Sequence, residues 1–470
     1  MIVVGGGLAG LSSAIALAEA GWRVRLLEKR PHLGGRAASY TLPDGTEIDN
    51  CQHVTLGCCT NLEDFYGRVG AQEKIRYFER LAFADRSGRI SRIGPWPLPA
   101  PLHLGPSFAC FRGLSVADKL AIARALMAIL RSGGRPEGAT AATMLEWLRE
   151  QRQTPGAIER FWRVVLVSAL DEELDRTQAQ YGIDVFWKGF LMNHAGYRIG
   201  VPAVPLGELY AGCRSALEQR GGEIRTRARV SGFSIEEGRV VGLVLEDGSE
   251  EAADAYVSAV PHSALLDLLP AEVVEREPVF GQLRQFGSSP ITGVHLWFDR
   301  EVTQEPFLAL MGMESQWIFN KTRLLEAAAN GSGNGPGGQG QYLQVVISAS
   351  YDLVSRSRQE IIELVRKELG EVLPVTRTAR MVKATVVKET AATFSPALGV
   401  DRWRPEAQSP IRQLFLAGDW TRTGWPATME SAVRSGYLAA QAILSRAGQH
   451  RTFLQPDLPP EGFVQMLVRS

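Results

Sequence analysis

The chain has 470 residues, of which 45% are hydrophobic and 22% charged, as in ordinary globular proteins, and this length supports about two or three lobes with sizeable cores. Lys and Arg number 51 together, as do Asp and Glu, so no net charge attracts nucleic acid and no nucleic-acid partner is expected. Five cysteines without C-x-x-C spacing and seven histidines without paired-ligand spacing argue against a disulfide framework and a metal site. A reducing, cytoplasmic compartment fits this cysteine usage, and no apolar run is long enough to predict a transmembrane helix.

The first predicted elements are a strand at 1–4, a glycine turn, a helix over 11–20 and a second strand at 22–27. In the turn Gly5, Gly7 and Gly10 form G-x-G-x-x-G, whose glycines permit a tight turn, close approach of a pyrophosphate and close helix packing. The helix N-terminus offers free N–H groups to phosphates.

Glu28 ends the second strand, where a carboxylate accepts hydrogen bonds from a ribose 2′-hydroxyl. This order of elements predicts a dinucleotide site. The candidate cofactor contacts in this part are Gly5, Gly7, Leu8, Ala9, Gly10, Glu28 and Lys29.

A second glycine turn, Gly34-Gly35-Arg36, follows directly. It resembles the turn that lies against FAD in the amine oxidase and phytoene desaturase flavoprotein superfamily. Its arginine is expected to offer its guanidinium to the pyrophosphate or to the flavin edge.

The residue composition, and with it the predicted structure, changes twice in the middle of the chain. Residues 40–90 read as a continuation of the nucleotide domain with short strands, whereas the repeated prolines of 93–114 forbid a regular helix and predict an apolar extended segment that covers the core or meets lipid. A mostly helical insertion follows, with Ser115 as an N-cap. Its expected helices are 117–131, 140–152, 155–170 and 177–191.

Mixed structure is predicted beyond the insertion. A helix at 204–220 precedes a strand at 223–229, hairpin strands within 230–248 and a buried strand at 256–261. An α+β lobe follows, in which 327–341 is expected to be a flexible hairpin tip. Its elements are strands at 291–299, 315–320, 342–350 and 378–388 and a helix at about 357–370.

A third diagnostic strand begins at residue 411 and ends in Gly418-Asp419, before a helix over 425–444. In an FAD fold, an acid at this strand end accepts a hydrogen bond from a ribityl hydroxyl, and the following helix aims its N-terminus at the flavin. The candidate contacts in this half are Val230, Gly418, Asp419, Thr428 and Met429.

The stretch 417–436 reads Ala-Gly-Asp-Trp-Thr-x-Thr-Gly-x-Pro-Ala-Thr-Met-Glu-x-Ala-Val-Arg-Ser-Gly. It resembles the signature of squalene-associated FAD-dependent desaturases, the hydroxysqualene dehydroxylases, which are relatives of phytoene desaturase. Asp49-Asn-x-Gln-His53 is similar to that family's Asp-Asn-Gly-Gln-His, with Cys51 where glycine is usual, and 391–396 and 454–460 are weaker similarities. The resemblance covers nearly the whole chain.

The resemblance implies an FAD enzyme that reductively removes the hydroxyl of hydroxysqualene, giving squalene for hopanoid synthesis. Two alternatives stay open: an oxidative carotenoid or phytoene-type desaturase, and a flavin-binding assembly protein without turnover. An amine oxidase is less favoured, because the C-terminal block lacks the aromatic cage pattern expected near a cation. With no second dinucleotide motif, electrons are expected from a diffusing donor or from the substrate, and no motif specifies an oligomeric state.

His53 is the predicted catalytic residue, because it lies in the narrow family motif and imidazolium donates a proton near neutral pH. Asp49 or Gln52 is expected to orient it, or else His53 holds the loop or the flavin. The acidic run Asp171–Glu173 is interpreted as a solvated helix face.

A dry apolar tunnel is the further requirement of an isoprenoid substrate. Its candidate lining is Trp96, Phe108, Phe111, Phe161, Trp162, Phe186, Trp187 and Phe190, although core packing is the commoner role of any one of them. Because an isoprenoid substrate partitions into the lipid bilayer, we expect the protein to contact the inner face of the membrane peripherally, through 93–114 or the tail at 453–468.

The predicted fold is therefore α/β: a discontinuous Rossmann-like FAD-binding domain of the glutathione reductase type, with an α+β substrate lobe and a helical, membrane-facing insertion. The expected division is FAD-binding parts at 1–90, 216–265 and 401–450, a helical insertion at 91–215, an α+β lobe at 266–400 and a tail at 451–470.

Overall fold

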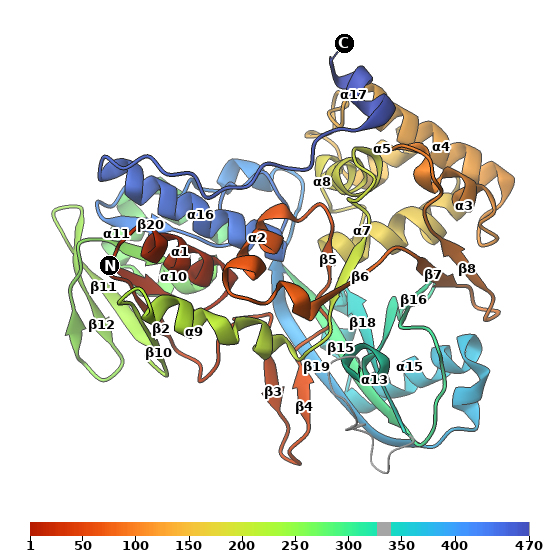
Figure 1. Cartoon of the computed structure of the whole chain (residues 1–470), viewed down its shortest axis with the longest axis horizontal. Coiled ribbons are helices and arrows are strands. Elements are labelled where there is room, and N and C mark those ends of the chain that lie inside the picture. Colours follow the sequence, from red (N-terminus) through yellow and green to blue (C-terminus); the bar gives the residue numbers. More distant parts are fainter. Residues whose placement is uncertain (327–339, 470) are drawn as a thin grey trace.

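A computed structural model describes residues 1–326 and 340–469 of the chain. Figure 1 shows one lobe around the N-terminal strands on the left, and on the right a helical lobe above a large sheet. This is the predicted α/β architecture, with a split Rossmann-like domain, an α+β lobe and a helical insertion. The flexible tip expected at 327–341 lies almost wholly outside the described residues.

A five-stranded parallel sheet with the order β10-β2-β1-β14-β20 forms the centre of the first lobe. Its strands come from three separate stretches of the chain, as the split motifs predicted. They are β1 (Ile2–Val4), β2 (Arg25–Glu28), β10 (Glu223–Thr226), β14 (Tyr256–Ser258) and β20 (Leu414–Leu416).

Helices α1 (Leu8–Glu19) and α16 (Met429–Arg446) pack tightly against each other in this lobe. A Cβ added to Gly436 would lie 2.1 Å from Ser12 Oγ, so only glycine permits this approach. The first and last parts of the chain are thereby held together. Two further helices of this lobe are α2 (Thr60–Arg68) and α9 (Ala211–Glu218).

Smaller sheets and helices are attached to the first lobe. The hairpin predicted within 230–248 is present and gains a third strand. The strands are β11 (Val230–Glu236), β12 (Arg239–Leu245) and β13 (Glu250–Glu251); the pair β3 (Ser39–Thr41) and β4 (Glu47–Asp49); and β5 (Thr55–Leu56), β6 (Ile75–Phe78) and β9 (Ile199–Pro202). The helices are α10 (His262–Leu268), α11 (Ala271–Arg276) and α12 (Pro278–Gly281).

A seven-stranded sheet with the order β19-β15-β18-β17-β16-β7-β8 forms the second lobe. Strands β7 and β8 belong to this sheet and not to the nucleotide-binding sheet that the sequence led us to expect, because β7 pairs with β16. The strands are β7 (Leu81–Ala84), β8 (Ile90–Ile93), β15 (Ser288–Phe298), β16 (Phe307–Leu310), β17 (Trp317–Asn320), β18 (Gln341–Ser348) and β19 (Met381–Phe394). Its helices are α13 (Lys321–Glu326), α14 (Tyr351–Val354) and α15 (Arg358–Val372).

The helical insertion is present, with Ser115 capping α4 as predicted. The proline-rich segment differs from the prediction, because Gly105–Ala109 forms the short helix α3 with Pro106 in its first turn, where proline is tolerated. The remaining helices are α4 (Val116–Arg131), α5 (Met144–Glu150), α6 (Pro155–Ala157), α7 (Arg163–Leu170) and α8 (Ala179–Phe186), with π-helical turns at Ile158–Trp162 and Trp187–Leu191.

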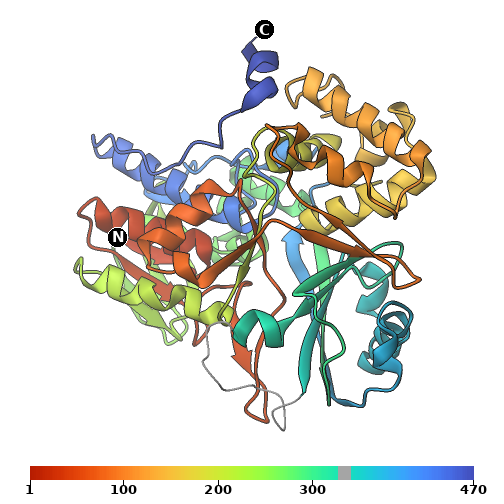
Figure 2. The same cartoon turned by 45° about the vertical axis from the view of Figure 1, so that its right-hand side comes forward.

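The C-terminal tail crosses from the first lobe to the helical lobe, as Figure 1 and Figure 2 show. It ends in α17 (Gly462–Arg469), whose Val464 is buried while Phe463 is half exposed. Asn61 Oδ1 accepts a hydrogen bond from the backbone of Gln455, which fixes the start of the crossing. Within the described residues, none of the helices has both the length and the apolar character needed to cross a bilayer.

Candidate functional site

The two glycine turns lie side by side at the carboxyl end of β1. Gly34 N–H donates to the carbonyl oxygen of Gly6 at 2.8 Å, and Gly5 and Gly34 have φ values of +109° and +100°, which favour glycine. A Cβ on Gly10 would lie 1.9 Å from the Gly5 carbonyl oxygen. Helix α1 begins here without a capping side chain, so its first-turn N–H groups are available to an anion.

Glu28 is buried beside these turns. Its two carboxylate oxygens accept hydrogen bonds from the backbone N–H groups of Gly6 at 2.6 Å and Arg30 at 2.7 Å. The segment that leads into Val230 also lies next to Glu28, as the hydrogen bond from Ala228 N–H to the Glu28 carbonyl oxygen at 2.9 Å shows. Lys29 is exposed next to it.

Arg36 joins the N-terminal and C-terminal halves of the predicted site. Its guanidinium contacts Asp419 Oδ1 at 2.7 Å and the Ala392 carbonyl oxygen at 2.6 Å. Asp419 follows Gly418 at the end of β20, and its side chain is 7% exposed. The pairing brings together residues 383 positions apart in the chain.

Helix α16 starts just beyond, where Thr428 Oγ1 accepts a hydrogen bond from Ser431 N–H at 3.1 Å. Thr428 and Met429 both line a cavity of about 350 Å³ that extends toward the helical lobe. The other predicted contacts, Leu8 and Ala9, are buried in the first turn of α1.

The cavity is largely apolar, and its wall is built from every lobe. Four of the eight predicted tunnel aromatics line it, while Phe111, Trp162 and Trp187 pack in the core and Trp96 is exposed. Its aromatic lining is Phe83, Phe108, Phe161, Phe186, Phe190, Trp317, Phe319 and Trp425.

Asp49 forms a buried ion pair that the sequence did not reveal. Lys321 Nζ lies 2.7 Å from Asp49 Oδ2 and donates to Gln52 Oε1 at 2.9 Å, with Lys321 and Asp49 1% and 3% exposed. Burial alone would raise the pKa of Asp49, but the Lys321 ammonium and the hydrogen bonds outweigh it and lower the pKa. Gln52 lines the cavity, so this pair fixes one part of its wall.

Known proteins with similar sequences and folds identify the family. The model of the flavin-containing amine oxidoreductase family matches residues 8–444. The chain belongs to this family. A 15-cis-phytoene desaturase of Solanum lycopersicum is 29% identical over 94% of this chain and 77% of its own length, and a zeta-carotene desaturase of Synechocystis is 27% identical over 96% and 98%. The solved structure of an oxidoreductase from Methanosarcina mazei has a TM-score of 0.72 at 18% identity, covering 94% of this chain and 99% of that chain.

FAD is therefore the cofactor of this flavin-containing amine oxidoreductase. The two glycine turns fit it, because a Cβ on Gly5 would lie 2.7 Å from the Ala259 carbonyl oxygen and a Cβ on Gly10 1.9 Å from the Gly5 carbonyl oxygen, so only glycine permits this tight turn into the uncapped start of α1. Glu28, Arg36 and Asp419 stay the predicted contacts of the FAD ribose, pyrophosphate and ribityl chain. Bound FAD would supply hydride transfer at the cavity.

His53 lies in a setting that weakens its predicted role as a proton donor. Its Nδ1 lies 3.0 Å from the Cys51 carbonyl oxygen, which places the proton of the neutral ring on Nδ1. Burial lowers the pKa of His53, so the ring is mainly neutral at neutral pH. Neither Asp49 nor Gln52 orients the imidazole: Asp49 binds Lys321, and Gln52 Nε2 donates to the His53 carbonyl oxygen.

The prediction that Asp171–Glu173 forms a solvated face was wrong for two of its three residues. Asp171 accepts hydrogen bonds from Ala349 N–H at 2.8 Å and Thr393 Oγ1 at 2.9 Å, and burial raises its pKa to about 8. Glu172 is fully buried and accepts a hydrogen bond from Tyr351 Oη at 2.7 Å. The helical pattern could not reveal this, because the partners come from β19, α14 and the residue just after β18.

Proposed function

We propose that this FAD-dependent oxidoreductase acts on a long isoprenoid and that it converts hydroxysqualene to squalene. The observation that carries the substrate class is the apolar cavity, which reaches the start of α16 where the sequence pattern places the flavin. The resemblance of 49–53 and 417–436 to hydroxysqualene dehydroxylases supports the particular reaction.

The FAD contacts are part of the same proposal. Gly5, Gly7, Leu8, Ala9 and Gly10 would hold the pyrophosphate from one side of the split site. The other side would be formed by residues at the end of β2, in the second glycine turn, at the start of β11 and around the start of α16. These are Glu28, Lys29, Gly34, Gly35, Arg36, Val230, Gly418, Asp419, Thr428 and Met429.

The reaction replaces a C–O bond by a C–H bond. Overall, the alcohol takes up two electrons and two protons and gives squalene and water. One proton leaves with the hydroxyl as water, and the other reaches the carbon together with both electrons as a hydride. An external donor supplies the two electrons. The protein must exclude water from the allylic carbon and deliver that proton. The aromatic wall contributed by α8 and by the π-helical turns Ile158–Trp162 and Trp187–Leu191 would exclude water, and His53 stays the predicted proton-transfer residue.

An oxygen-free incubation tests this proposal. Enzyme reduced with dithionite should convert hydroxysqualene to squalene, detected by mass spectrometry, whereas enzyme left oxidised should give none. Absence of squalene from the reduced enzyme, with FAD bound throughout, would contradict the proposed reaction.

Carotenoid desaturation is the second candidate, and the phytoene and zeta-carotene desaturase relatives favour it. It would use the same cavity but oxidise the substrate and therefore need an electron acceptor. Oxidised enzyme that introduces double bonds into phytoene, with no squalene formed from hydroxysqualene, would decide for this candidate. An FAD that neither bleaches nor recovers with any isoprenoid would instead indicate a flavin-binding assembly role.

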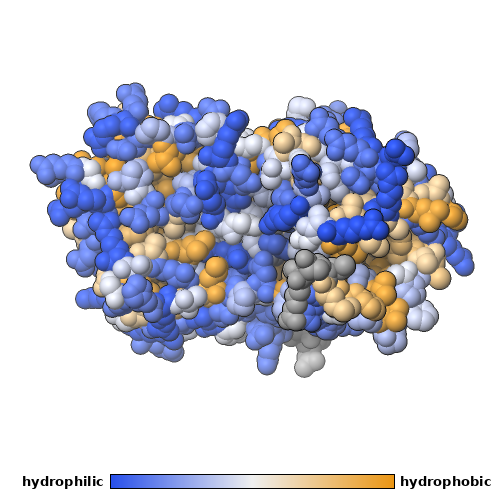
Figure 3. Space-filling view, turned by 90° about the horizontal axis from the view of Figure 1, so that it is seen from above, coloured by the Kyte–Doolittle hydropathy of each residue, from blue (hydrophilic) through white to orange (hydrophobic). Residues whose placement is uncertain are grey.

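We also propose that the helical lobe contacts the inner face of the membrane. Figure 3 shows apolar residues at the right edge, the side of the helical lobe, and others on the left over the first lobe. Pro101, Leu104 and Phe108 line the cavity, and exposed apolar residues lie near them in the sequence and in α4 and α17. These exposed residues are Trp96, Leu98, Leu102, Val116, Leu120, Met127, Phe463 and Met466. Failure of the purified protein to bind liposomes at low and high salt alike would contradict this contact.

A further inference from the structure

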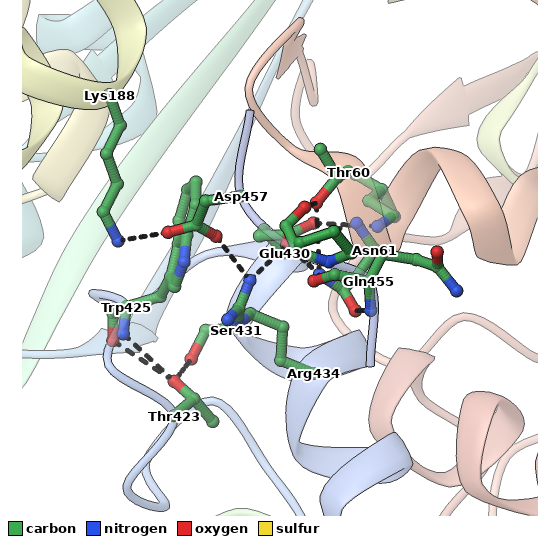
Figure 4. A network of polar contacts seen from close by, with 12 residues as sticks. Thr60, Asn61, Lys188, Thr423, Trp425, Glu430, Ser431, Arg434, Gln455 and Asp457 are labelled. Carbon is green, nitrogen blue, oxygen red and sulfur yellow. Dashed lines mark hydrogen bonds and ion pairs between the residues drawn. The ribbon is translucent and has the colours of Figure 1, made fainter. Parts of the chain in front are cut away.

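One part of the apolar cavity is polar. Lys188 and Trp425 line it beside Glu430, in the first turn of α16. Figure 4 shows Lys188 reaching toward Asp457 above Trp425, with Arg434 on the same network. We call Lys188 and Trp425, together with Arg434, which packs against the Trp425 ring but does not itself line the cavity, the polar end of the cavity.

Two N–H donors in the polar end have no hydrogen-bond acceptor among the described residues. They are Trp425 Nε1 and Arg434 Nε. Trp425 is 6% exposed, so bulk water does not satisfy its indole N–H. A buried donor without a partner is unfavourable, and native structures usually supply one. Because Trp425 lines the cavity, a ligand in the cavity is a natural source of the missing oxygen.

Two cations lie against the Trp425 ring. Lys188 Nζ is 4.4 Å from the ring centroid and Arg434 Cζ is 5.6 Å from it. Asp457 holds both cations, at 3.2 Å from Lys188 Nζ and 2.8 Å from Arg434 Nη1. Positive charge against the π-system draws electron density from the ring and makes its N–H a stronger donor.

The other tryptophan of the cavity wall provides a contrast. Trp317 also lines the cavity, but its Nε1 already donates to Ser168 Oγ at 2.7 Å. Its indole therefore has no hydrogen bond to offer a ligand. Of these two tryptophans, only Trp425 has an indole N–H without an acceptor among the described residues.

We propose that Trp425 recognises oxygen on the substrate, its indole N–H donating a hydrogen bond to the hydroxyl of an isoprenoid alcohol. This inference rests on the proposed function and deepens it, because it distinguishes an isoprenoid alcohol from a pure hydrocarbon. The polar end adjoins the start of α16, so a hydroxyl bound there lies beside the predicted flavin position.

Binding to the oxidised, FAD-loaded protein tests the inference, since this form holds no hydride to transfer. Hydroxysqualene and squalene are titrated separately, and the change in flavin fluorescence gives each Kd. One additional hydrogen bond predicts roughly tenfold tighter binding of hydroxysqualene to the wild type. Trp425→Phe keeps the ring and removes the N–H, so the two ligands should then bind alike, while Trp317→Phe, the matched control, should keep the tenfold ratio.

Equal affinities for the two ligands in the wild type would overturn the inference, whatever the folding of the variants. A ratio unchanged by Trp425→Phe, or abolished equally by Trp317→Phe, would also overturn it. If squalene forms but hydroxysqualene binds no more tightly than squalene, the inference fails and the proposed function stands. If the tighter binding of hydroxysqualene depends on Trp425 but no squalene forms, the inference stands and the proposed function fails.

Discussion

Replacing Lys321 by methionine should destabilise the protein strongly, because it leaves the Asp49 carboxylate buried without its cation. The two side chains are 1% and 3% exposed, so solvent does not screen their 2.7 Å contact. Removing one partner of such a pair costs about 3–5 kcal/mol. The carboxylate would keep its hydrogen bonds from Ser39 Oγ at 2.7 Å and Leu206 N–H at 3.0 Å, which places the expected loss toward the lower value.

Urea-induced unfolding measures this loss, and the same helix provides its control. Arg323 pairs with Glu301 at 2.7 Å, but these side chains are 44% and 48% exposed, so Arg323→Met should change the unfolding free energy by less than about 1 kcal/mol. The double variant Asp49→Asn, Lys321→Met removes both charges and should lose less than Lys321→Met alone. Equal losses from Lys321→Met and Arg323→Met would refute the reasoning.

The dependence on pH provides a second check on this prediction. The pKa of Asp49 is lowered in the folded wild type, so its stabilising contribution is present above the unfolded pKa of about 3.9 and is lost as the pH falls through the folded value. Without Lys321, burial acts unopposed and raises the pKa of Asp49, so the carboxyl takes up a proton at a less acidic pH. The loss caused by Lys321→Met should therefore shrink between about pH 8 and about pH 5. A loss independent of pH would show that Asp49 is not its source.

Two further substitutions test the cofactor site and the membrane surface. Asp419→Ala should weaken FAD binding about tenfold to a hundredfold through loss of a charge-assisted hydrogen bond, whereas His53→Ala should slow turnover with FAD retained; equal loss of flavin from both would make His53 a cofactor residue. Phe463→Glu should weaken liposome binding by about tenfold or more. Val375→Glu, which alters an exposed apolar residue outside the helical lobe, should leave liposome binding unchanged. Equal effects of the two substitutions would contradict membrane contact through the helical lobe.

Local patterns were sufficient to predict that the parallel sheet of the first lobe is assembled from separate stretches of the chain. The glycines of both turns, Glu28 and Asp419 stand at strand ends, and neighbouring parallel strands bring such ends to one edge of a sheet. The pairing of Arg36 with Asp419 then follows from the split fold, although 383 positions separate them.

Residues whose partners lie in unrelated segments could not be predicted in this way. The local sequence does not mark Lys321 as a partner of Asp49 until β4 lies beside it. Asp171 reads as exposed until Ala349, just after β18, and Thr393 of β19 contact it. Trp425 lies inside the C-terminal motif, but its unused N–H is visible only when Lys188 and the cavity are in place. These interactions depend on packing between lobes, which no local period encodes.

A single-turnover experiment tests the central claim most directly. Fully reduced enzyme is mixed with hydroxysqualene in the absence of oxygen, and flavin absorbance and squalene are followed together. The proposed function predicts that the oxidised flavin spectrum returns with one squalene formed per flavin. A spectrum that stays reduced, with hydroxysqualene recovered unchanged, would contradict it.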